Sequence, residues 1–175
     1  DLLDINGTKA AFASIGAVAR VTREKLQRDI PGLWGHILAA RIMPKLGQEE
    51  MEIEMIDGRE DSGRPFERNI LRTKLLDCVV SKTKHFGYGW KVAPKAQIDD
   101  GYADIVFFQT TGLGYLLLFP LIYTGLFQRR QKHFKAKRVI FRGKNLHVQY
   151  HGDLLGVRDR VEVRVLPRAL KIIVP

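Results

Sequence analysis

The stretch Ala93–Ile105, APKAQIDDGYADI, holds the most informative pattern in this sequence. It begins as a polar turn, in which two adjacent carboxylates, Asp99 and Asp100, stand directly before Gly101. An apolar segment follows at once, and this order is typical of a turn that leads into a β-strand. We therefore expect a strand over Ala103–Gln109 with an oxygen-rich loop at its start.

Alternating apolar segments between turns dominate the rest of the chain over helical periodicity. The segment Lys9–Ser14 follows an Asn-Gly turn at residues 6–7, and Met51–Met55 alternates before a second expected turn at residues 57–58. Further strands are expected at Ile70–Val80, Arg138–Arg142, Leu146–Gln149, Val161–Val165 and Leu170–Val174.

Three segments are expected to be helical: Ala17–Arg28, Leu33–Met43 and Leu116–Phe127. Pro120 lies inside the last segment and would kink or stop that helix. The polar stretch Gly58–Arg68 predicts an exposed loop. Many short strands with a few helices predict an α+β domain that is predominantly antiparallel β, arranged as a sandwich or a barrel-like sheet.

Composition agrees with one domain over residues 1–175, because 175 residues of which 45% are hydrophobic can bury a sizeable core. The net charge of +10 favours acidic partners, namely phospholipid surfaces, nucleotide phosphates or nucleic acid, without choosing among them. The single cysteine, Cys78, cannot form an internal disulfide and is interpreted as a small buried hydrophobe. Nothing in this usage indicates an oxidising compartment.

The acidic loop offers ligands of the kind that a hard divalent cation binds. A carboxylate flanked by backbone carbonyls suits Mg²⁺, which takes oxygen ligands and usually keeps several waters. The same residues also fit a loop without metal, in which Asp99 and Asp100 make Asx-turn hydrogen bonds that start the next strand. The loop pattern leaves both interpretations open.

The tripeptide His151-Gly152-Asp153 follows a predicted strand that ends at Tyr150. Phosphoryl transfer to a hydroxyl group needs a carboxylate that orients the hydroxyl and accepts its proton, and Asp153 is a candidate for that role. A plain hairpin turn explains the same tripeptide.

The segment His85–Trp90, HFGYGW, combines two glycines with aromatic residues. Gly87 and Gly89 would let the backbone approach a ligand, and the aromatic side chains could line a slot for an acyl chain. In the alternative, the glycines supply positive φ angles and the aromatic side chains pack in the interior.

An apolar segment, Gly114–Phe127, precedes a basic segment, Gln128–Lys144, that contains no Asp or Glu. The apolar segment is shorter than the roughly 20 residues that a membrane-spanning helix needs. Near an anionic membrane, Arg129, Arg130 and Lys132 would contribute about 1 kcal/mol each, and an adjacent apolar helix could enter the interface. The alternative is a core helix followed by a solvated basic strand.

Three landmarks together resemble the C-terminal domain of the diacylglycerol kinase and sphingosine kinase-like lipid kinases. They are the DDG-containing run of Ala93–Ile105, the Asn-Gly turn at residues 6–7 before a strand, and HGDLLG followed by LPRALKIIVP at the end. The resemblance covers nearly the whole chain. It implies a partner, an N-terminal ATP-binding domain that holds the co-substrate ATP, and the Gly-Gly-Asp-Gly-Thr motif of that domain does not occur in this sequence.

The resemblance also implies roles for individual residues. A structural Mg²⁺ would be held by the carboxylate of Asp100 with the carbonyls of Gln97 and Tyr102. Asp153 would be the general base, although the family usually has Asp-Gly-Glu where this chain has His-Gly-Asp. The shorter acid withdraws the carboxylate by about 1 Å, and a misplacement of that size can cost about a hundredfold in rate.

For the lipid substrate, the resemblance implies that Gly87 and Gly89 lie near the interdomain cleft. His151 would orient Asp153 or contact phosphate.

We therefore expect the C-terminal part of an ATP-dependent lipid kinase, in which this domain contributes the general base and the lipid-binding surface. The substrate would be diacylglycerol, a sphingoid base or a related alcohol, and the isolated chain would be inactive. We expect a cytoplasmic protein with peripheral membrane association. The alternative is a noncatalytic lipid-binding or regulatory module, in which His-Gly-Asp marks lost catalysis. A nucleic-acid partner is not expected, because the aromatic and basic residues lack the spacing of a recognised RNA motif.

Overall fold

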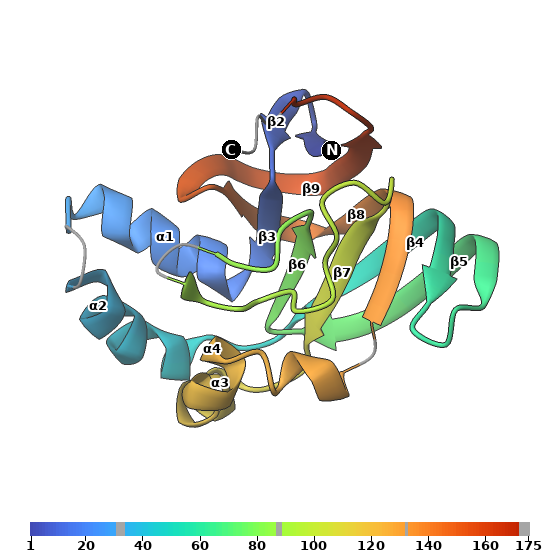
Figure 1. The fold of residues 1–175 in the computed structure, drawn as a ribbon. Helices are drawn as coiled ribbons and strands as arrows, with labels where there is room; N and C mark the ends of the chain where they lie inside the picture. Colours follow the sequence, from blue (N-terminus) through green and yellow to red (C-terminus); the bar gives the residue numbers. More distant parts are fainter. Residues whose placement is uncertain (31–33, 87–88, 132, 172–175) are drawn as a thin grey trace.

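Long antiparallel strands dominate the computed structural model, which describes residues 1–30, 34–86, 89–131 and 133–171 (Figure 1). In chain order the strands are β1 (Leu2–Ile5), β2 (Thr8–Ala10), β3 (Phe12–Gly16), β4 (Glu49–Glu60), β5 (Pro65–Leu75), β6 (Asp77–Ser81), β7 (Ala103–Phe108), β8 (His133–Tyr150) and β9 (Asp153–Leu166). The helical segments are α1 (Ala17–Gln27), α2 (Trp34–Ile42), the 3₁₀ turn η1 (Met43–Lys45), α3 (Gly112–Leu117), α4 (Phe119–Tyr123) and the 3₁₀ turn η3 (Gln128–Arg130).

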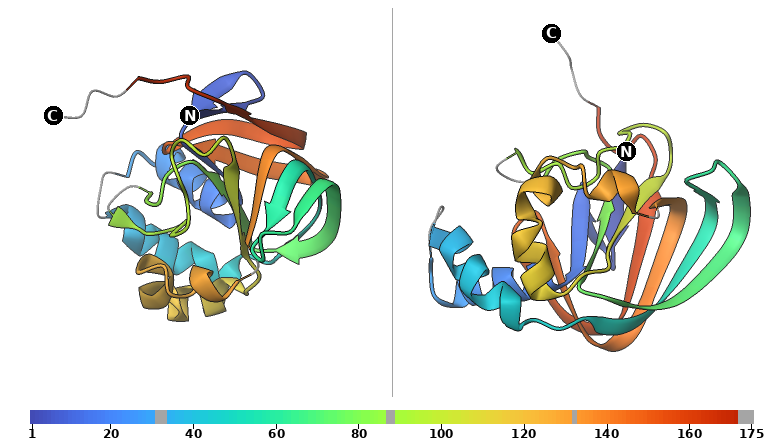
Figure 2. Two further views of the ribbon diagram at one scale, coloured as in Figure 1. Left: turned by 45° about the vertical axis from the view of Figure 1, so that its right-hand side comes forward. Right: turned by 90° about the horizontal axis from the view of Figure 1, so that it is seen from below.

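Strand β8 connects the two strand layers. It pairs with β9 on one side and with β4 on the other, so that β1, β2, β9, β8, β4 and β5 form one curved layer. The second layer contains β3, β6 and β7, and both of its edges return to β8: β3 pairs near Tyr150, and β7 pairs near Phe134. The result is sandwich-like rather than a regular barrel, and the β4–β5 hairpin lies opposite the helices (Figures 1 and 2).

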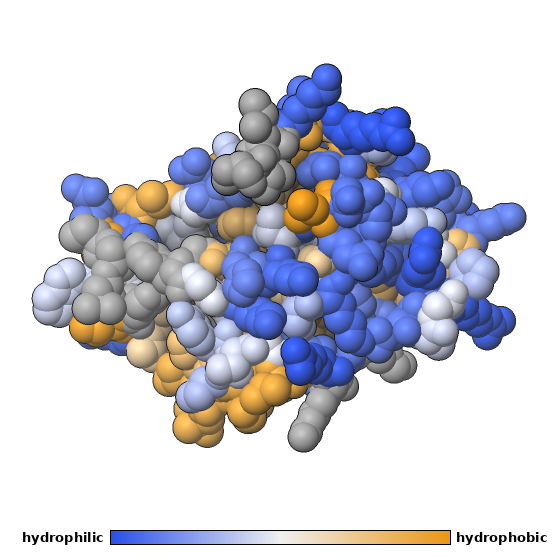
Figure 3. Space-filling view, viewed as in Figure 1, coloured by the Kyte–Doolittle hydropathy of each residue, from blue (hydrophilic) through white to orange (hydrophobic). Residues whose placement is uncertain are grey.

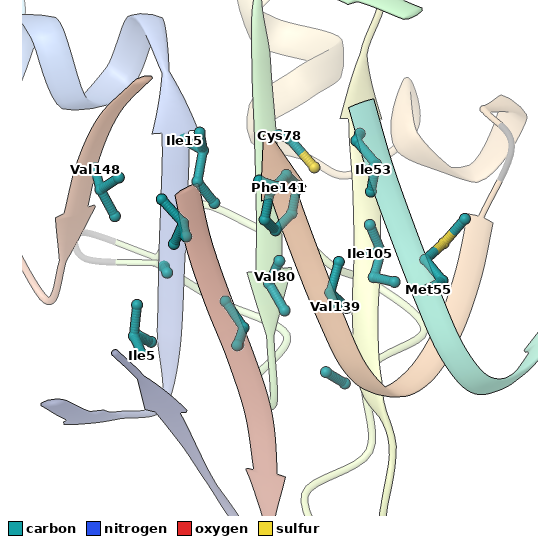
Figure 4. Packing of buried hydrophobic residues seen from close by; sticks show 14 of the residues in the cluster. Ile5, Ile15, Ile53, Met55, Cys78, Val80, Ile105, Val139, Phe141 and Val148 are labelled. Carbon is teal, nitrogen blue, oxygen red and sulfur yellow. The ribbon is translucent and has the colours of Figure 1, made fainter. Parts of the chain in front are cut away.

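The main hydrophobic core lies between these two layers (Figure 4). Side chains from both layers meet there, and Ile15, Ile53, Val80, Ile105 and Phe141 are fully buried. Cys78 belongs to this core, which confirms its interpretation as a small buried hydrophobe. Burying one such aliphatic or aromatic side chain contributes about 1.5–3 kcal/mol.

A second core lies on the other face of β6 and β7. Val79 and Phe108 pack there with Tyr115 of α3 and Ile122 of α4. Strand β7 is therefore buried on both faces, and this explains why it is a continuous apolar run. The helices form a third layer over β6 and β7, the two strands on either side of the acidic loop.

Several expected elements match the structure closely. Helices α1 and α2 lie within the expected segments Ala17–Arg28 and Leu33–Met43, and β7 has the expected start. Leu116–Phe127 is divided between α3, α4 and later turns, and Pro120 occupies the first turn of α4, where its missing N–H costs nothing. The strand expected at Leu170–Val174 is wrong at Leu170, and residues 172–174 lie outside the described part of the chain.

The expected loop Gly58–Arg68 is wrong, because β4 and β5 extend through most of it. Asp57 has a φ of 50° and is left out of the pairing on both sides, but the register is the same before and after it, so the strand continues where a turn was expected. Gly58 then pairs with Phe66, and a Cβ at Gly58 would lie 2.3 Å from the carbonyl oxygen of Lys135. The polar residues of this stretch belong to the exposed end of the β4–β5 hairpin. Their polarity reflects exposure to solvent, not the absence of strand structure.

Two other strand predictions have wrong limits. The expected strand Ile70–Val80 is divided at Leu76, where the chain passes from β5 in one layer to β6 in the other. The expected strands Arg138–Arg142 and Leu146–Gln149 are parts of β8, whose register with β9 shifts between them.

Ion pairs cover the outer face of the β4, β8 and β9 strands. Glu162 on β9 pairs with Arg138 at 2.8 Å and Arg160 at 2.7 Å, and it also pairs with Arg164. Burial raises the pKa of the Glu162 carboxyl group, but hydrogen bonds from these three arginines outweigh burial and lower that pKa to about 2. Glu162 therefore stays ionised at any physiological pH.

Helix α3 lies so close to η1 that one position has no room for a side chain. A Cβ at Gly112 would lie 1.8 Å from the carbonyl oxygen of Met43. We expect Gly112→Ala to lower the free energy of unfolding by about 1–3 kcal/mol or more, because overpacking must move the backbone. Gly47→Ala is the control, since a Cβ there meets nothing within 4 Å and should change stability by under about 0.5 kcal/mol. Equal effects in denaturant titrations would contradict this packing.

The Glu162 ion pairs predict a specific pH dependence of stability. A folded-state pKa of about 2 lies below the unfolded value, so the stabilisation is present above about pH 4.5 and is lost as the pH falls toward 2. The difference in unfolding free energy between wild type and Glu162→Gln should therefore be largest at neutral pH and should vanish near pH 2. The exposed Glu67 provides the control, because Glu67→Gln should give a small difference at every pH. A pH-independent difference for Glu162→Gln would contradict the assignment.

Candidate functional site

The turn between β8 and β9, residues 150–153, is a tight two-residue hairpin turn. His151 has a φ of 46° and Gly152 a φ of 92°, as a type I′ turn requires, and Tyr150 pairs with Asp153 across it. The backbone N–H of Gly152 donates to Oε1 of the buried Gln149 at 3.1 Å. The expected hairpin turn is therefore present, and the side chain of Gln149 holds it in this conformation.

His151 fastens this turn to β3. Its Nε2 accepts a hydrogen bond from the backbone N–H of Ala11 at 2.8 Å. Nε2 therefore acts as an acceptor here, which leaves Nδ1 as the ring nitrogen that can donate. The ring also meets Phe12 edge to face, with 4.9 Å between ring centroids. In the structure these two contacts of His151 position the turn.

Asp153, the first residue of β9, is exposed. Within the described residues its carboxylate has no hydrogen bond or ion pair to another side chain or to the backbone. Other acids of β9 differ in this respect: Asp159 accepts the backbone N–H of Asn145 at 2.9 Å, and Glu162 is held by arginines. Asp153 is therefore an accessible carboxylate on a rigid turn.

A series of contacting aromatic rings connects His151 to the glycine-containing segment His85–Trp90. Phe12 stacks on Phe86 with 3.9 Å between ring centroids, and Phe86 meets Trp90 edge to face at 5.3 Å. Trp90 continues to Tyr115 of α3 at 6.2 Å. Gly89 has a φ of 76°, whereas Gly87 lies outside the described residues. These contacts show that the aromatic side chains Phe86 and Trp90 pack in the interior.

The acidic loop is built around two lysine side chains. Nζ of Lys82 donates to Oδ1 of Asp100 at 2.7 Å and to the carbonyl oxygen of Tyr102 at 2.5 Å. Nζ of Lys135 donates to the other carboxylate oxygen of Asp100 at 2.6 Å. Burial raises the pKa of Asp100, but the hydrogen bonds from Lys135, Lys82 and the backbone N–H of Tyr102 outweigh it and lower that pKa below its usual range.

These contacts test whether the loop fits the expected Mg²⁺. Two of the three expected ligands, the carboxylate of Asp100 and the carbonyl of Tyr102, do converge, but they converge on the ammonium group of Lys82. Gln97 is exposed and does not contribute to these contacts. Among the described residues, no group of three or more His, Cys, Asp or Glu side chains is arranged to hold a metal. The donor set therefore does not fit a divalent cation.

The basic segment after residue 127 is used in several ways. Arg138 and Arg142 form ion pairs with glutamates of neighbouring strands, and Lys135 binds Asp100. Arg129 is exposed, whereas the side chain of Arg130 and the whole of residue 132, a lysine, lie outside the description. Of the three residues expected to form a basic surface, the structure therefore describes the side chain of Arg129 alone.

Apolar side chains are exposed on α3, α4 and the turn that follows them. Leu113 and Leu117 lie on α3, Leu121 on α4, and Leu126 after it, and Leu117 is 72% exposed. The space-filling view shows apolar residues gathered over these helices (Figure 3). We call these four residues the apolar helical surface. None of the helices in the described part of the chain is long and apolar enough to cross a membrane.

A cationic cavity of about 400 Å³ lies between α1 and β8, and the sequence did not indicate it. Arg20 and Arg23 of α1, Arg28 at the C-terminal end of that helix and His147 of β8 line it. Burial, Arg20 and Arg23 lower the pKa of His147, so that this imidazole is neutral at physiological pH. Arg20 pairs with a glutamate of β4 and Arg28 with one of α1, which balances much of the positive charge.

A buried carboxylate at the first residue of β6, Asp77, lies against the start of α1, and the sequence analysis missed it. Asp77 accepts hydrogen bonds from the Oγ of Ser14, at 3.0 and 2.9 Å, and from the backbone N–H of Val18 at 3.3 Å. Burial raises the pKa of Asp77 well above its usual range, against the effect of these hydrogen bonds. Gly16 is required beside it, because a Cβ there would lie 2.6 Å from the carbonyl oxygen of Leu76.

Comparison with solved structures agrees with this architecture. A diacylglycerol kinase from Bacillus anthracis str. Sterne superposes with a TM-score of 0.62 at 16% sequence identity, over 95% of this chain and 53% of that protein. A second structure of such a protein from the same bacterium gives a TM-score of 0.64 at 15% identity, with the same coverage. At these identities the likeness shows the fold, and this chain spans about half the length of those proteins.

Among curated proteins, no match was found. Residues 15–174 match the family described as the YegS C-terminal NAD kinase beta sandwich-like domain. The match covers most of the chain, from β3 through the β8–β9 turn to the end of the last strand and beyond. The chain therefore belongs to the family of YegS C-terminal, NAD kinase beta sandwich-like domains.

Proposed function

We propose that this chain is the substrate-binding half of a two-domain lipid kinase, and that Asp153 is its general base. The observation that carries the proposal is the exposed carboxylate of Asp153, which has no partner among the described residues and stands on a turn fastened to β3 by His151. The fold is shared with proteins described as diacylglycerol kinases, and these are about twice as long as this chain.

The chemistry assigned to the turn is proton acceptance. As the hydroxyl oxygen of a lipid attacks the γ-phosphorus of ATP, its O–H bond breaks and the proton passes to the Asp153 carboxylate. The P–O bond to ADP breaks in the same transfer, and ADP leaves from the N-terminal domain that holds the nucleotide. This chain then supplies a positioned base and a site for the alcohol, whereas the N-terminal domain supplies the groups that hold the phosphates.

The proposed substrate is an alcohol with a long acyl or alkyl chain. The apolar helical surface supports this choice, because side chains such as Leu117 would be expected to enter an interface between lipid headgroups and acyl chains. Arg129 and the net charge of +10 would add attraction to anionic lipid. We propose that the protein takes its substrate from a membrane surface through these residues.

A second candidate function is a noncatalytic lipid-binding or regulatory module. The observation that favours it is that His151, at the place where the family usually has an acid, is engaged in a hydrogen bond with the backbone of Ala11, together with the short side chain of Asp153. Both candidate functions use the apolar helical surface. They differ in whether Asp153 in the β8–β9 turn supports phosphorylation of a lipid.

In the full-length protein, Asp153→Asn should lower the rate of lipid phosphorylation by roughly 10²–10⁴-fold, because it keeps the shape of the side chain but removes proton acceptance. The affinity for ATP should hardly change. Asp153→Glu should hold or raise the rate, and Asp159→Asn is the control carboxylate on the same strand, with an expected change of less than about threefold. Lipid phosphorylation is measured by transfer of labelled γ-phosphate.

Two outcomes of this experiment are decisive. An active wild type that is indifferent to Asp153→Asn would overturn Asp153 as the base. An inactive wild type that gains activity when His151→Asp is combined with Asp153→Glu would show a decayed site and support the noncatalytic module.

Binding to lipid vesicles tests the surface separately from catalysis. Leu117→Asp should weaken binding to vesicles that contain anionic lipid by about tenfold or more, because it removes a large apolar side chain from the interface. Arg129→Glu should weaken it by a smaller factor that shrinks as salt is added. The matched control is Ile70→Asp, which replaces another exposed aliphatic side chain on β5, away from the helices. Equal losses for Leu117→Asp and Ile70→Asp would contradict the assigned surface.

A further inference from the structure

Lys82 is a buried lysine at the end of a buried strand. It follows β6 directly, and 1% of its side chain is exposed. Lysine is almost never buried to this extent unless its charge is paired, because removing an ammonium group from water is very costly. The environment of this ammonium group therefore has to supply its compensation.

Three oxygen atoms from separate parts of the chain surround Nζ of Lys82. They are Oδ1 of Asp100 at 2.7 Å, the carbonyl oxygen of Tyr102 at 2.5 Å and Oδ2 of Asp1 at 3.3 Å. An ammonium group has three N–H donors and no acceptor, so this arrangement can satisfy it completely. The contact with Asp1 is the longest and is an ion pair at this distance.

The two acids are themselves fixed by the backbone. Asp1 accepts the backbone N–H of Gly101 at 2.9 Å and that of Arg168 at 3.0 Å, so it joins the acidic loop to the segment after β9. Asp100 accepts the backbone N–H of Tyr102 at 3.1 Å. The ammonium of Lys82 thus lies where the N-terminal residue Asp1, the end of β6 and the acidic loop meet. A bound cation in a loop of this composition would join oxygen ligands in the same way.

The position of Nζ excludes a metal ion at the same point. Mg²⁺ binds oxygen at about 2.0–2.1 Å, so an ion on the same oxygens of Asp100 and Tyr102 would overlap with the ammonium group. A second ammonium, that of Lys135, lies 2.6 Å from Asp100 and 3.7 Å from Asp104, and it would repel a dication. Binding of Mg²⁺ would require Lys82 to leave its buried position.

We propose that the ammonium group of Lys82 takes the place of a divalent cation in the acidic loop, so that this chain holds the loop without metal. The inference does not depend on the proposed function, because it concerns the stability of the loop. One consequence reaches the β8–β9 turn: the backbone N–H of Lys82 donates to the carbonyl of Ala11 at 2.8 Å, and the N–H of Ala11 donates to His151. The loop and the turn share this backbone connection.

Thermal unfolding of the chain with Mg²⁺ and with EDTA tests the proposal. The wild type should unfold at the same temperature in both. Lys82→Ala should lower the unfolding temperature by roughly 6–20 °C, because it leaves buried carboxylates without their cation. In that variant Mg²⁺ should raise the unfolding temperature again and EDTA should cancel the rise, since the emptied space offers the oxygens of Asp100 and Tyr102 to the metal.

The matched control is Lys84→Ala, which removes an exposed ammonium two residues further along the chain. It should change the unfolding temperature by no more than about 2 °C in either solution. If Lys82→Ala does not fold, calorimetric titration of the wild type with Mg²⁺ still tests the proposal, and no binding heat is expected.

Two results would overturn the proposal. The first is a wild type that binds Mg²⁺ and loses stability in EDTA. The second is a Lys82→Ala variant whose unfolding temperature does not respond to Mg²⁺, since Lys82 would then be an ordinary ion-pair partner rather than the replacement for a cation.

Discussion

Strand β8 pairs with β9, β4, β3 and β7, and the positions of the other elements follow from these pairings. Its length lets one end join β7 and the other end join β3, which closes both strand layers around the main core. Because β9 returns directly from β8, the turn between them must lie beside β3. The candidate base is therefore placed by the strand pairing, before any side-chain chemistry is considered.

Electrostatics acts differently on the two faces of this framework. On the outer face, Glu162 and its arginines are partly solvated, and the pair with Arg138 fastens β9 to β8. At the acidic loop, the ammonium of Lys82 is withdrawn from solvent and is compensated by Asp100 and Asp1, while Asp100 also binds Lys135. Asp153 differs from both, because its carboxylate is exposed and has no partner among the described residues.

Much of the fold could be predicted from the sequence because one-sided burial leaves a periodic pattern. Helix α1 and strand β7 were predicted within one or two residues on that basis. The pattern found the segment Met51–Met55 of β4 but failed at the far ends of β4 and β5, which form an exposed hairpin with polar residues on both faces. It also failed at the centre of β8, where Gly143 to Asn145 have the composition of a turn but continue the strand through an irregularity in its register.

The site was harder to predict than the fold, because its contacts join residues far apart in the sequence. The resemblance named Asp100, Tyr102 and Asp153, but no local signal shows that Lys82 reaches the first two, since a lysine after an apolar run is ordinarily exposed. A charged residue that directly follows the buried segment Leu75–Ser81 was the available hint. The link from Phe12 to His151 likewise needed the register of β3 with β8, which composition does not give.

The central claim is that this domain presents a lipid hydroxyl to ATP held by another domain. The most direct measurement is transfer of labelled γ-phosphate from ATP by the full-length protein, offered long-chain alcohols in mixed micelles and NAD in parallel. The account predicts labelled phospholipid, formed when the ATP-binding domain is present and absent when this chain is assayed alone. Label on NAD and none on any long-chain alcohol would contradict it.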